Sequence, residues 1–350
     1  MKKKILLVTE YLNPPYDEGI KKTVYNLYLG LNQRYELQVI CRHGFKNNAV
    51  HIVKTNRLYA SGKIARIISE FAPDTILYLP FQSSTFASYL RLRILHFFWK
   101  RAQILFIALQ PKSLKVWQLF LVKFCKPDYA FTPSHVLHTF WNEMGIFNEL
   151  VPLLTDMNIF RSLEDASQKE KLREKYNLPL KATILSHMGH LNEGRNLRSL
   201  IPVQGNGFQV VIVSSTSTPS DALGKQSLKA DLEDCGIIVI DRYIEAIQEL
   251  YQLSDMYLFP VVDKNSSIGL PLSILEARAC GIPVISTDYG SVRNFLFDDY
   301  GSILYINPNE FIDKVRIMKK RLNEDHSKTN VMHLNALFFE SIYKIIDTTN

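Results

Sequence analysis

Apolar runs and amphipathic stretches alternate along this chain. A continuous apolar run is typical of a strand that is buried on both faces of a parallel sheet. The predicted strands are residues 4–9, 36–41, 73–80, 103–109, 129–134, 182–187, 208–214, 236–240, 256–260 and 284–287. Apolar residues at helical spacing lie between several of them, as at Val24, Leu27 and Leu31. This alternation predicts an α/β protein built on parallel sheets.

The order of these elements divides the chain into two Rossmann-like halves. The first strand leads through a loop containing Gly19 into a helix, which is the opening unit of such a half. A charged helical stretch at residues 158–179 follows the first half, and a new strand begins after it. The length of 350 residues suits two domains of ordinary size. We predict domains over residues 1–155 and 156–330, and a terminal helix over 331–350.

Composition indicates a globular protein with a sizeable core. Apolar residues make up 47% of the chain and charged residues 21%, which argues against disorder. The four cysteines are scattered and form no Cys-x-x-Cys pair, so we expect reduced core residues rather than a disulfide framework or a metal site. The apolar run after the basic N-terminus is too short for a signal peptide, and no uncharged run reaches the roughly 18 residues of a spanning helix.

The net charge of +7 is unevenly spread, and no acidic residue occurs between Asp74 and Asp128. Basic and large aromatic residues are mixed there: Arg91, Arg93, Phe97, Phe98, Trp99, Lys100, Arg101, Lys112, Lys115, Trp117, Phe120, Lys123, Phe124 and Lys126. This mixture suits an anionic membrane surface, and we predict membrane contact through residues 91–126. The alternatives are core helices whose basic side chains reach solvent, and nucleic-acid binding, for which no known module is visible.

A stretch in the second half, residues 266–290, carries the strongest candidate chemistry. A loop with Gly269 leads into a short helix, which Gly281 ends as a C-cap glycine would. Glu276 lies on this helix. Free N–H groups at a helix start suit a phosphate, and a carboxylate about one turn further can accept two hydrogen bonds from a ribose diol. The alternative is an ordinary α/β crossover with a solvent-facing glutamate.

The same stretch resembles the signature of the family-four retaining glycosyltransferases of the GT-B fold. Their pattern is Glu, seven residues, then Glu-Ala-Met-Ala-Cys-Gly-x-Pro-Val, and residues 276–284 here read Glu-Ala-Arg-Ala-Cys-Gly-Ile-Pro-Val. The second family glutamate, which holds the donor ribose, corresponds to Glu276. The first corresponds to Ile268, a departure that concerns the handling of the donor sugar rather than nucleotide binding.

The resemblance spans nearly the whole chain, although only the segment around Glu276 is specific. It implies an α/β, GT-B fold: two Rossmann-like, doubly wound domains with a cleft between them and a C-terminal helix that crosses back to the first domain. The first domain would bind the acceptor and the second the nucleotide sugar. The loop at Gly19 would approach the donor phosphates, although a simple helix-entry turn explains this glycine as well.

Position in the family pattern implies further donor-binding residues. The family's arginine and lysine on the donor diphosphate correspond to His190 and Arg195. Arg195 keeps the charge and can bind phosphate bidentately, whereas a histidine is cationic only part of the time and His190 fits a plain turn as well. Tyr243 would stack on the nucleobase or merely line the domain. The residues around the start of the Glu276 helix would surround the sugar phosphate: Gly269, Leu270, Pro271 and Leu272.

No general base is assigned, because glutamine stands at Gln82 and Gln110, where many relatives carry histidine. In the resembled family the donor phosphate is thought to assist deprotonation, so the absence of a base is compatible with activity. No Asp-x-Asp motif marks a metal site. We therefore expect no required metal ion and no cofactor, with the nucleotide-diphosphate sugar as donor substrate.

The predicted activity is transfer of a sugar from a nucleotide-diphosphate sugar to a glycan or lipid-linked acceptor, with retention of the anomeric configuration. Arg195 and Glu276 would be the catalytic residues, with Arg195 stabilising the leaving diphosphate. We expect a cytoplasmic protein, peripheral on the inner face of a membrane, in cell-surface polysaccharide or glycan biosynthesis. The alternatives are a catalytically degenerate binding or scaffold subunit, which Ile268 motivates, and a nucleotide-sugar epimerase of the same fold.

Overall fold

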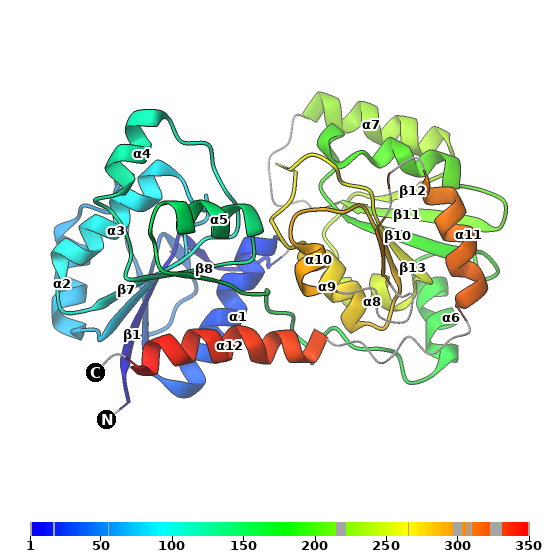
Figure 1. The fold of residues 1–350 in the computed structure, drawn as a ribbon. Coiled ribbons are helices and arrows are strands. Elements are labelled where there is room, and N and C mark those ends of the chain that lie inside the picture. Colours follow the sequence, from blue (N-terminus) through cyan, green and yellow to red (C-terminus); the bar gives the residue numbers. More distant parts are fainter. Residues whose placement is uncertain are drawn as a thin grey trace. The chain divides into compact units, whose positions relative to one another are not determined.

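Two compact units make up the chain (Figure 1). The computed structural model describes residues 2–16, 18–54, 56–214, 222–264, 266–296, 303–305, 307, 310–322 and 331–348. Unit 1 comprises Met1–Leu154, Ile268–Leu270 and Asn335–Asn350, and unit 2 comprises Thr155–Ser267 and Pro271–Leu334. Each unit holds one large parallel sheet, so the prediction of an α/β protein with two Rossmann-like halves is confirmed.

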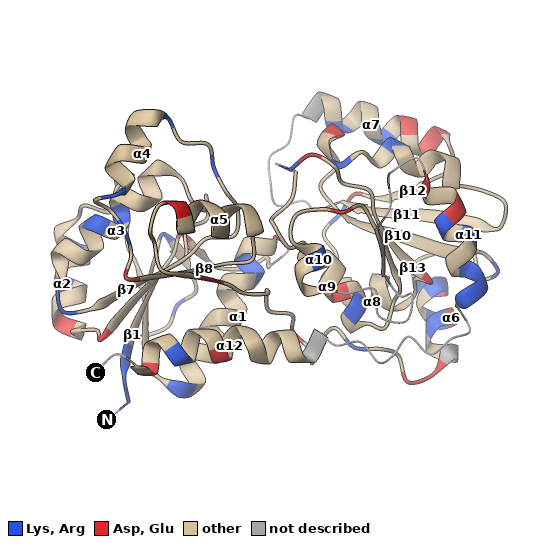
Figure 2. Cartoon of the chain, in the orientation of Figure 1, with Lys and Arg blue, Asp and Glu red and all other residues tan. Residues whose placement is uncertain are grey.

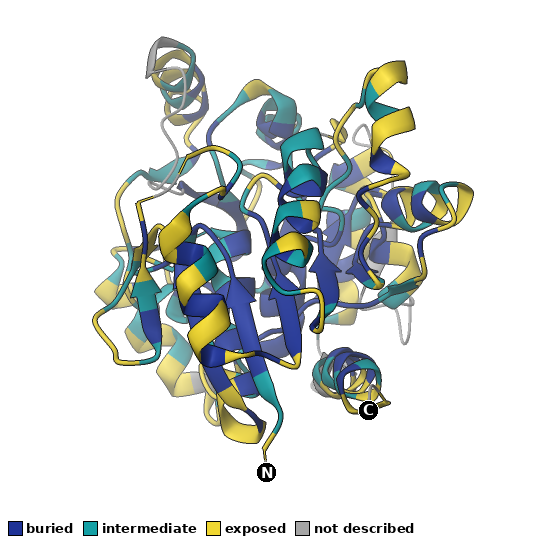
Figure 3. Cartoon of the chain, turned by 90° about the vertical axis from the view of Figure 1, so that its left-hand side faces the viewer, coloured by how far each residue is buried: buried dark blue, intermediate teal, exposed yellow. Residues whose placement is uncertain are grey.

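The large sheet of unit 1 has the order β5-β3-β1-β6-β7-β8-β9. Its strands are β1 Lys4–Val8, β3 Glu36–Cys41, β5 Val50–Ile52, β6 Thr75–Tyr78, β7 Gln103–Ile107, β8 Tyr129–Thr132 and β9 Asn148–Leu150. β1 lies between β3 and β6, with Leu6 opposite both Gln38 and Ile76. A short second sheet pairs β2 Tyr11–Leu12 with β4 His43–Gly44. The central strands are buried, as their dark blue colour in Figure 3 shows, because helices cover a parallel sheet on both faces.

Helices of unit 1 form where apolar residues recur on one face. They are α1 Gly19–Arg34, α2 Gly62–Phe71, α3 Phe86–Phe98, α4 Val116–Val122 and α5 His135–Glu143. In α2, for example, Ile64, Ile67, Ile68 and Phe71 are buried at helical spacing. Residues of the terminal helix α12 Val331–Thr348 pack on this unit: the Tyr343 hydroxyl donates to the carbonyl oxygen of Gly30 at 3.2 Å.

The sheet of unit 2 has the order β12-β11-β10-β13-β14-β15. Its strands are β10 Thr183–Gly189, β11 Phe208–Ser214, β12 Ile238–Ile240, β13 Met256–Phe259, β14 Val284–Ser286 and β15 Ile303–Tyr305. Its helices are α6 Ala166–Lys175, α7 Ala222–Asp234, α8 Ile247–Gln252, α9 Leu272–Ala279, α10 Val292–Phe295 and α11 Phe311–Arg321, with the 3₁₀ turns η1 Glu193–Arg195 and η2 Leu197–Val203. The carboxyl ends of β10, β13 and β14 meet at one edge, which is where ligands bind in such sheets.

Two expectations need correction in this fold. All four cysteines are free, but only Cys41, Cys125 and Cys280 are buried, because Cys235 follows the end of α7 and is exposed. The charged stretch expected to be helical over residues 158–179 is helical only over α6, which begins at Ala166.

Candidate active site

Arg195 lies at the carboxyl-terminal edge of the unit 2 sheet. It is the last residue of η1, and its backbone N–H donates to the Asn192 side chain at 3.2 Å, which caps this turn. The guanidinium folds back over the end of β10, where a Cβ on Gly189 would lie 2.2 Å from the Arg195 Nη1 atom. Glycine at position 189 therefore allows the arginine side chain to lie directly against the strand end.

The charge of Arg195 has no carboxylate partner in the parts of the chain that the structure describes. The residue is 7% exposed, and its Nε atom has no hydrogen-bond acceptor there. Burial lowers the pKa of the guanidinium, and the nearby phenols of Tyr257, Tyr289 and Tyr251 raise it. A buried cation without a counter-charge is costly. The arrangement suits an anionic ligand.

His187 is a neighbour of Arg195 that sequence reasoning missed. It is fully buried in β10, and its Nδ1–H donates to the Leu258 carbonyl oxygen at 2.8 Å, which leaves the lone pair on Nε2. Nε2 has no partner among the described residues. Burial, and then the positive charge of Arg195, lower the pKa of His187 to about 3, so the ring is neutral at neutral pH. A histidine inside an otherwise apolar strand was the available signal.

Glu276 lies on α9 and is 3% exposed. The Tyr251 hydroxyl of α8 donates to its Oε2 atom at 2.8 Å. Its charge also acts on Tyr257 and on the Cys280 thiol, and burial together with Glu276 raises the pKa of both groups. α9 is a crossover helix between the parallel strands β13 and β14, but the alternative of a solvent-facing glutamate on it is wrong.

Arg195 and Glu276 belong to one polar cluster inside unit 2. Both charged side chains interact electrostatically with Tyr251 and with Tyr257. Among the described residues, no ion pair joins Arg195 to Glu276. The Tyr257 hydroxyl donates to the Met188 carbonyl oxygen at 3.3 Å and also bonds to Ser273 on α9. The cation and the carboxylate are thus linked through tyrosines that interact with both.

The loop after β13 packs against Arg195's own turn. A Cβ on Gly194 would lie 2.0 Å from the Ser266 Oγ atom. The Tyr289 hydroxyl donates to the Ser267 carbonyl oxygen at 2.8 Å and accepts from the Ser267 N–H at 3.1 Å. Tyr289 follows β14, so three strand ends contribute to this cluster. The sequence offered no signal for the role of Tyr289.

The remaining predicted donor-binding residues lie at other positions within the two units. His190 is half-buried in the turn after β10, and Tyr243, after β12, is 50% exposed. Gly19 is the first residue of α1 in unit 1. The Gly269 N–H donates to the Leu109 carbonyl oxygen at 3.2 Å within unit 1, so this N–H is already used. Leu270, Pro271 and Leu272 are buried at the start of α9.

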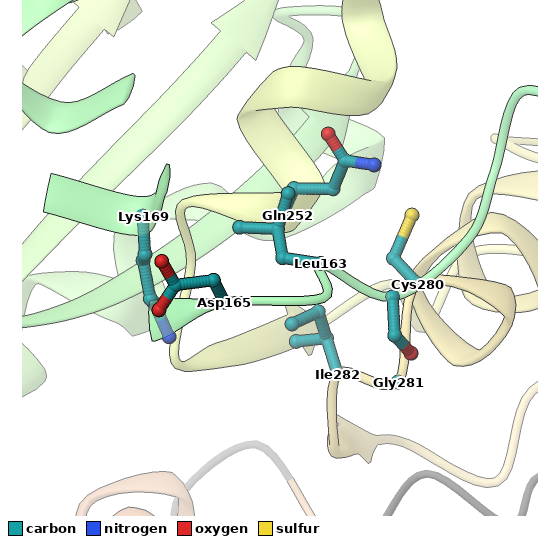
Figure 4. Close-up of a pocket in the computed structure, with 8 residues that line it drawn as sticks. Leu163, Asp165, Lys169, Gln252, Cys280, Gly281 and Ile282 are labelled. Atoms are coloured by element: carbon teal, nitrogen blue, oxygen red, sulfur yellow. The ribbon is translucent and has the colours of Figure 1, made fainter. Parts of the chain in front are cut away.

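A separate hollow of about 240 Å³ lies beside the C-terminal end of α9 (Figure 4). Its lining includes Asp165, Lys169, Gln252, Cys280, Gly281 and Ile282. Lys169 is already paired with Asp255 at 2.7 Å. None of the predicted donor-binding residues lines this hollow, and we assign it no ligand.

No cluster of His, Cys, Asp or Glu side chains among the described residues is arranged to hold a metal ion. None of the described helices combines the length and the apolar character that crossing a membrane requires.

Comparison with known proteins supports a glycosyltransferase. Residues 195–320 match the family Glycosyl transferases group 1. The chain is 29% identical over 200 residues to a processive diacylglycerol beta-glucosyltransferase of Bacillus licheniformis, covering 52% of this chain and 48% of the relative. It is 28% identical over 134 residues to the amylovoran biosynthesis glycosyltransferase AmsK of Erwinia amylovora, covering 36% of this chain and 32% of the relative. The matched regions are thus about half or less of these relatives.

Among solved structures, Anabaena HepE in complex with UDP-glucose has a TM-score of 0.74 to this chain. It is 14% identical and covers 97% of this chain and 99% of its own. A likeness at this identity concerns the fold. The chain therefore has the GT-B fold, and its second unit carries the segment that matches Glycosyl transferases group 1.

Proposed function

We propose that this protein is a retaining glycosyltransferase that uses a nucleotide-diphosphate sugar. The observation that carries the proposal is Arg195, a buried cation without a carboxylate partner in the described chain, in the same cluster as the buried carboxylate of Glu276. A nucleotide diphosphate offers the two complementary groups, since its phosphates are anionic and its ribose diol donates hydrogen bonds. Arg195 and Glu276 both lie in the second unit, and Glu276 belongs to the signature that resembles family four.

Each side chain has a separate role in this proposal. Arg195 neutralises the departing diphosphate, which lowers the barrier because the charge it meets grows during bond cleavage. Glu276 accepts hydrogen bonds from the ribose diol, and Tyr251 holds its carboxylate in place. His190 and the residues 269–272 around the start of α9 contact the phosphates, and Tyr243 contacts the nucleobase. Gly19 approaches the phosphates from the start of α1.

The acceptor is a glycan or a lipid-linked molecule that unit 1 binds at a membrane surface. Support comes from the basic-aromatic region 91–126 and from the relatives' names, one of which specifies diacylglycerol and the other amylovoran biosynthesis. In this proposal the protein acts on the inner face of a membrane in the synthesis of a cell-surface glycan, and it requires neither a metal ion nor a further cofactor.

The test is a thermal-shift screen of nucleoside diphosphates and their sugar conjugates, followed by an assay of the best donor with glycan and lipid acceptors. We expect one nucleotide family to raise the melting temperature and one acceptor to yield product. The proton–proton coupling at the anomeric carbon of that product then decides the stereochemistry. An inverted product would overturn retention. This measurement is needed because the name of one relative, a beta-glucosyltransferase, specifies a beta linkage.

A second candidate is a binding or scaffold subunit without turnover. It is favoured by Ile268, which stands where the resembled family carries its first glutamate. This candidate predicts nucleotide binding by calorimetry but no donor hydrolysis and no product with any acceptor. Restoring the carboxylate with Ile268→Glu sharpens the test, because gain of turnover in that variant alone would identify the natural chain as degenerate. Free sugar formed without an acceptor would instead favour the epimerase alternative.

A further inference from the structure

We propose that the exposed face of α4 inserts into the headgroup region of a membrane rich in anionic lipids. This inference deepens the membrane contact of the proposed function by naming the element that touches the bilayer. The face consists of Val116, Trp117, Phe120, Leu121 and Phe124, and we call it the α4 face.

The residues of the α4 face form one stripe that is turned to solvent. Their spacing of three to four residues puts them on one side of the helix and its C-terminal extension. Val116 is 84% exposed, Trp117 55%, Phe120 62% and Phe124 64%, whereas Val122 is the buried residue of α4. A core helix would show the opposite orientation, so the alternative of two core helices is wrong for α4.

The aromatic side chains of the α4 face pair with one another and with α3. The rings of Phe120 and Phe124 meet edge to face at 5.5 Å between centroids, and Trp117 meets Phe86 of α3 at 5.2 Å. Phe97 near the end of α3 is also exposed. A large solvent-exposed apolar patch is rare on a soluble protein unless a partner binds there. Aromatic rings with a polar edge, such as Trp117, favour the membrane–water interface.

The charge around the α4 face selects an anionic partner. Exposed basic residues surround it in the chain: Arg93, Lys100, Arg101, Lys112, Lys115, Lys123 and Lys126. None of these seven forms an ion pair within the described residues. The acidic residues at the two ends of this region, Asp74 and Asp128, form hydrogen bonds with the backbone. The Asp74 carboxylate accepts from the Lys4 N–H, and the Asp128 carboxylate accepts from the Ile104 N–H. Figure 2 accordingly shows blue and no red along α3 and α4.

One predicted member of this region does not contribute. Arg91 is buried and paired with Glu10 at 2.6 Å, so its charge is compensated inside unit 1. The remaining unpaired cations attract acidic headgroups, while the rings enter the boundary between headgroups and acyl chains. α4 has seven residues, far fewer than the roughly 20 that span a bilayer, so the contact is shallow.

The experiment is co-sedimentation of the full chain with vesicles of phosphatidylcholine alone or with about one third phosphatidylglycerol. We expect binding to the anionic vesicles that weakens with salt, and at least about a tenfold loss in the triple variant Trp117→Ser, Phe120→Ser, Phe124→Ser. Phe147→Ser is the matched control, because Phe147 is 77% exposed in unit 1 but lies outside the α4 face. Lys112→Gln with Lys115→Gln and Lys123→Gln should lose selectivity for phosphatidylglycerol.

Several results would overturn the inference. One is equal vesicle binding by the triple variant and the wild type. Others are no preference for anionic vesicles or no vesicle binding at all. A further one is a wild-type protein that is dimeric without lipid while the triple variant is monomeric. Thermal shift by a nucleoside diphosphate is measured on the same preparations. Nucleotide binding without vesicle binding contradicts the role of the α4 face alone, and vesicle binding without nucleotide binding contradicts the transferase proposal alone.

Discussion

Each unit contains a buried arginine near the carboxyl edge of its sheet, but the two arginines differ in how their hydrogen bonds and charge are matched by neighbouring groups. In unit 1, Arg91 donates through Nη1 to the Glu10 carboxylate at 2.6 Å and to the Tyr78 hydroxyl at 2.8 Å. Its Nε donates to the Arg57 carbonyl oxygen at 2.8 Å, and its plane lies over the Tyr59 ring. In unit 2, Arg195 is as deeply buried, but its neighbours are tyrosines and no described carboxylate pairs with it.

This difference is what we expect between a structural arginine and the ligand-binding arginine that we propose. A buried ion pair is tolerated because each charge compensates the other, and removing one partner leaves the other uncompensated. Glu10 also accepts from the Phe81 N–H at 2.7 Å, so the unit 1 pair fixes a loop at the sheet edge. Arg195 has no such task. In the proposed function, the cost of burying its charge is recovered when the donor diphosphate binds.

The largest expected effect is on stability, and it should appear in unit 1 only. Arg91→Met leaves Glu10 buried without its cation and should lower the free energy of unfolding by about 3–5 kcal/mol. Arg195→Met leaves no described carboxylate without its ion-pair partner, so the ligand-free variant should be at least as stable as the wild type. Urea unfolding of both variants measures this contrast, and equal destabilisation would abolish the distinction between the two arginines.

Glu276→Ala should cost roughly 2–4 kcal/mol of donor binding or transition-state stabilisation, because a buried acceptor of two hydrogen bonds is lost. The matched control is Glu249→Ala. Glu249 also accepts from a tyrosine hydroxyl, that of Tyr176 at 2.7 Å, but it lies outside the Arg195 cluster. Steady-state kinetics on both variants decides the matter, and unchanged donor kinetics in Glu276→Ala would end the ribose assignment.

Gly189→Ala should act on Arg195 without removing it. The new methyl group would displace the guanidinium from the end of β10, so we expect about tenfold weaker diphosphate binding, or ~1.4 kcal/mol. Gly62→Ala is the control, because a Cβ at Gly62 meets no atom within 4 Å. Calorimetric titration compares them. Full affinity in Gly189→Ala would show that the guanidinium position is unimportant.

The prediction with the smallest effect at neutral pH concerns His187, because its contribution to stability changes only under acidic conditions. His187 has a pKa lowered to about 3 in the folded protein, against about 6.5 when exposed. Between these values the unfolded chain binds a proton that the folded chain does not, so stability falls as pH drops from about 6.5 towards 3. His187→Gln should flatten this slope, as measured by urea unfolding at several pH values. An unchanged slope would contradict a buried neutral imidazole next to Arg195.

The sequence was sufficient to predict the parallel strands, and it named the candidates for the site. Strands such as β1 and β13 are buried on both faces, so they read as apolar runs, and Glu276 stood in a recognisable motif. Edge strands of three residues, such as β5, β9 and β15, carry too few residues for a pattern. These strands are set by pairing with neighbours far away in the chain, as Val39 with Val50 illustrates.

The environment of Arg195 could not be predicted for the same reason. Gly189, Tyr257 and Tyr289 meet the arginine only because three parallel strands end at one edge. A sequence pattern indicates that an arginine follows a glycine-rich turn, but not that its side chain folds back and finds tyrosines instead of carboxylates. That arrangement is a property of the packed unit.

The most direct measurement is calorimetric titration of the nucleoside diphosphate selected by thermal shift into wild type, Arg195→Met and Arg198→Met. Arg198 is the control, because it is three residues away and already bonded to Glu193 and Asp231. We predict wild-type affinity for Arg198→Met and a loss of about a hundredfold or more for Arg195→Met, with its fold intact. Equal affinity of all three proteins would contradict the claim that Arg195 is held unpaired for a diphosphate.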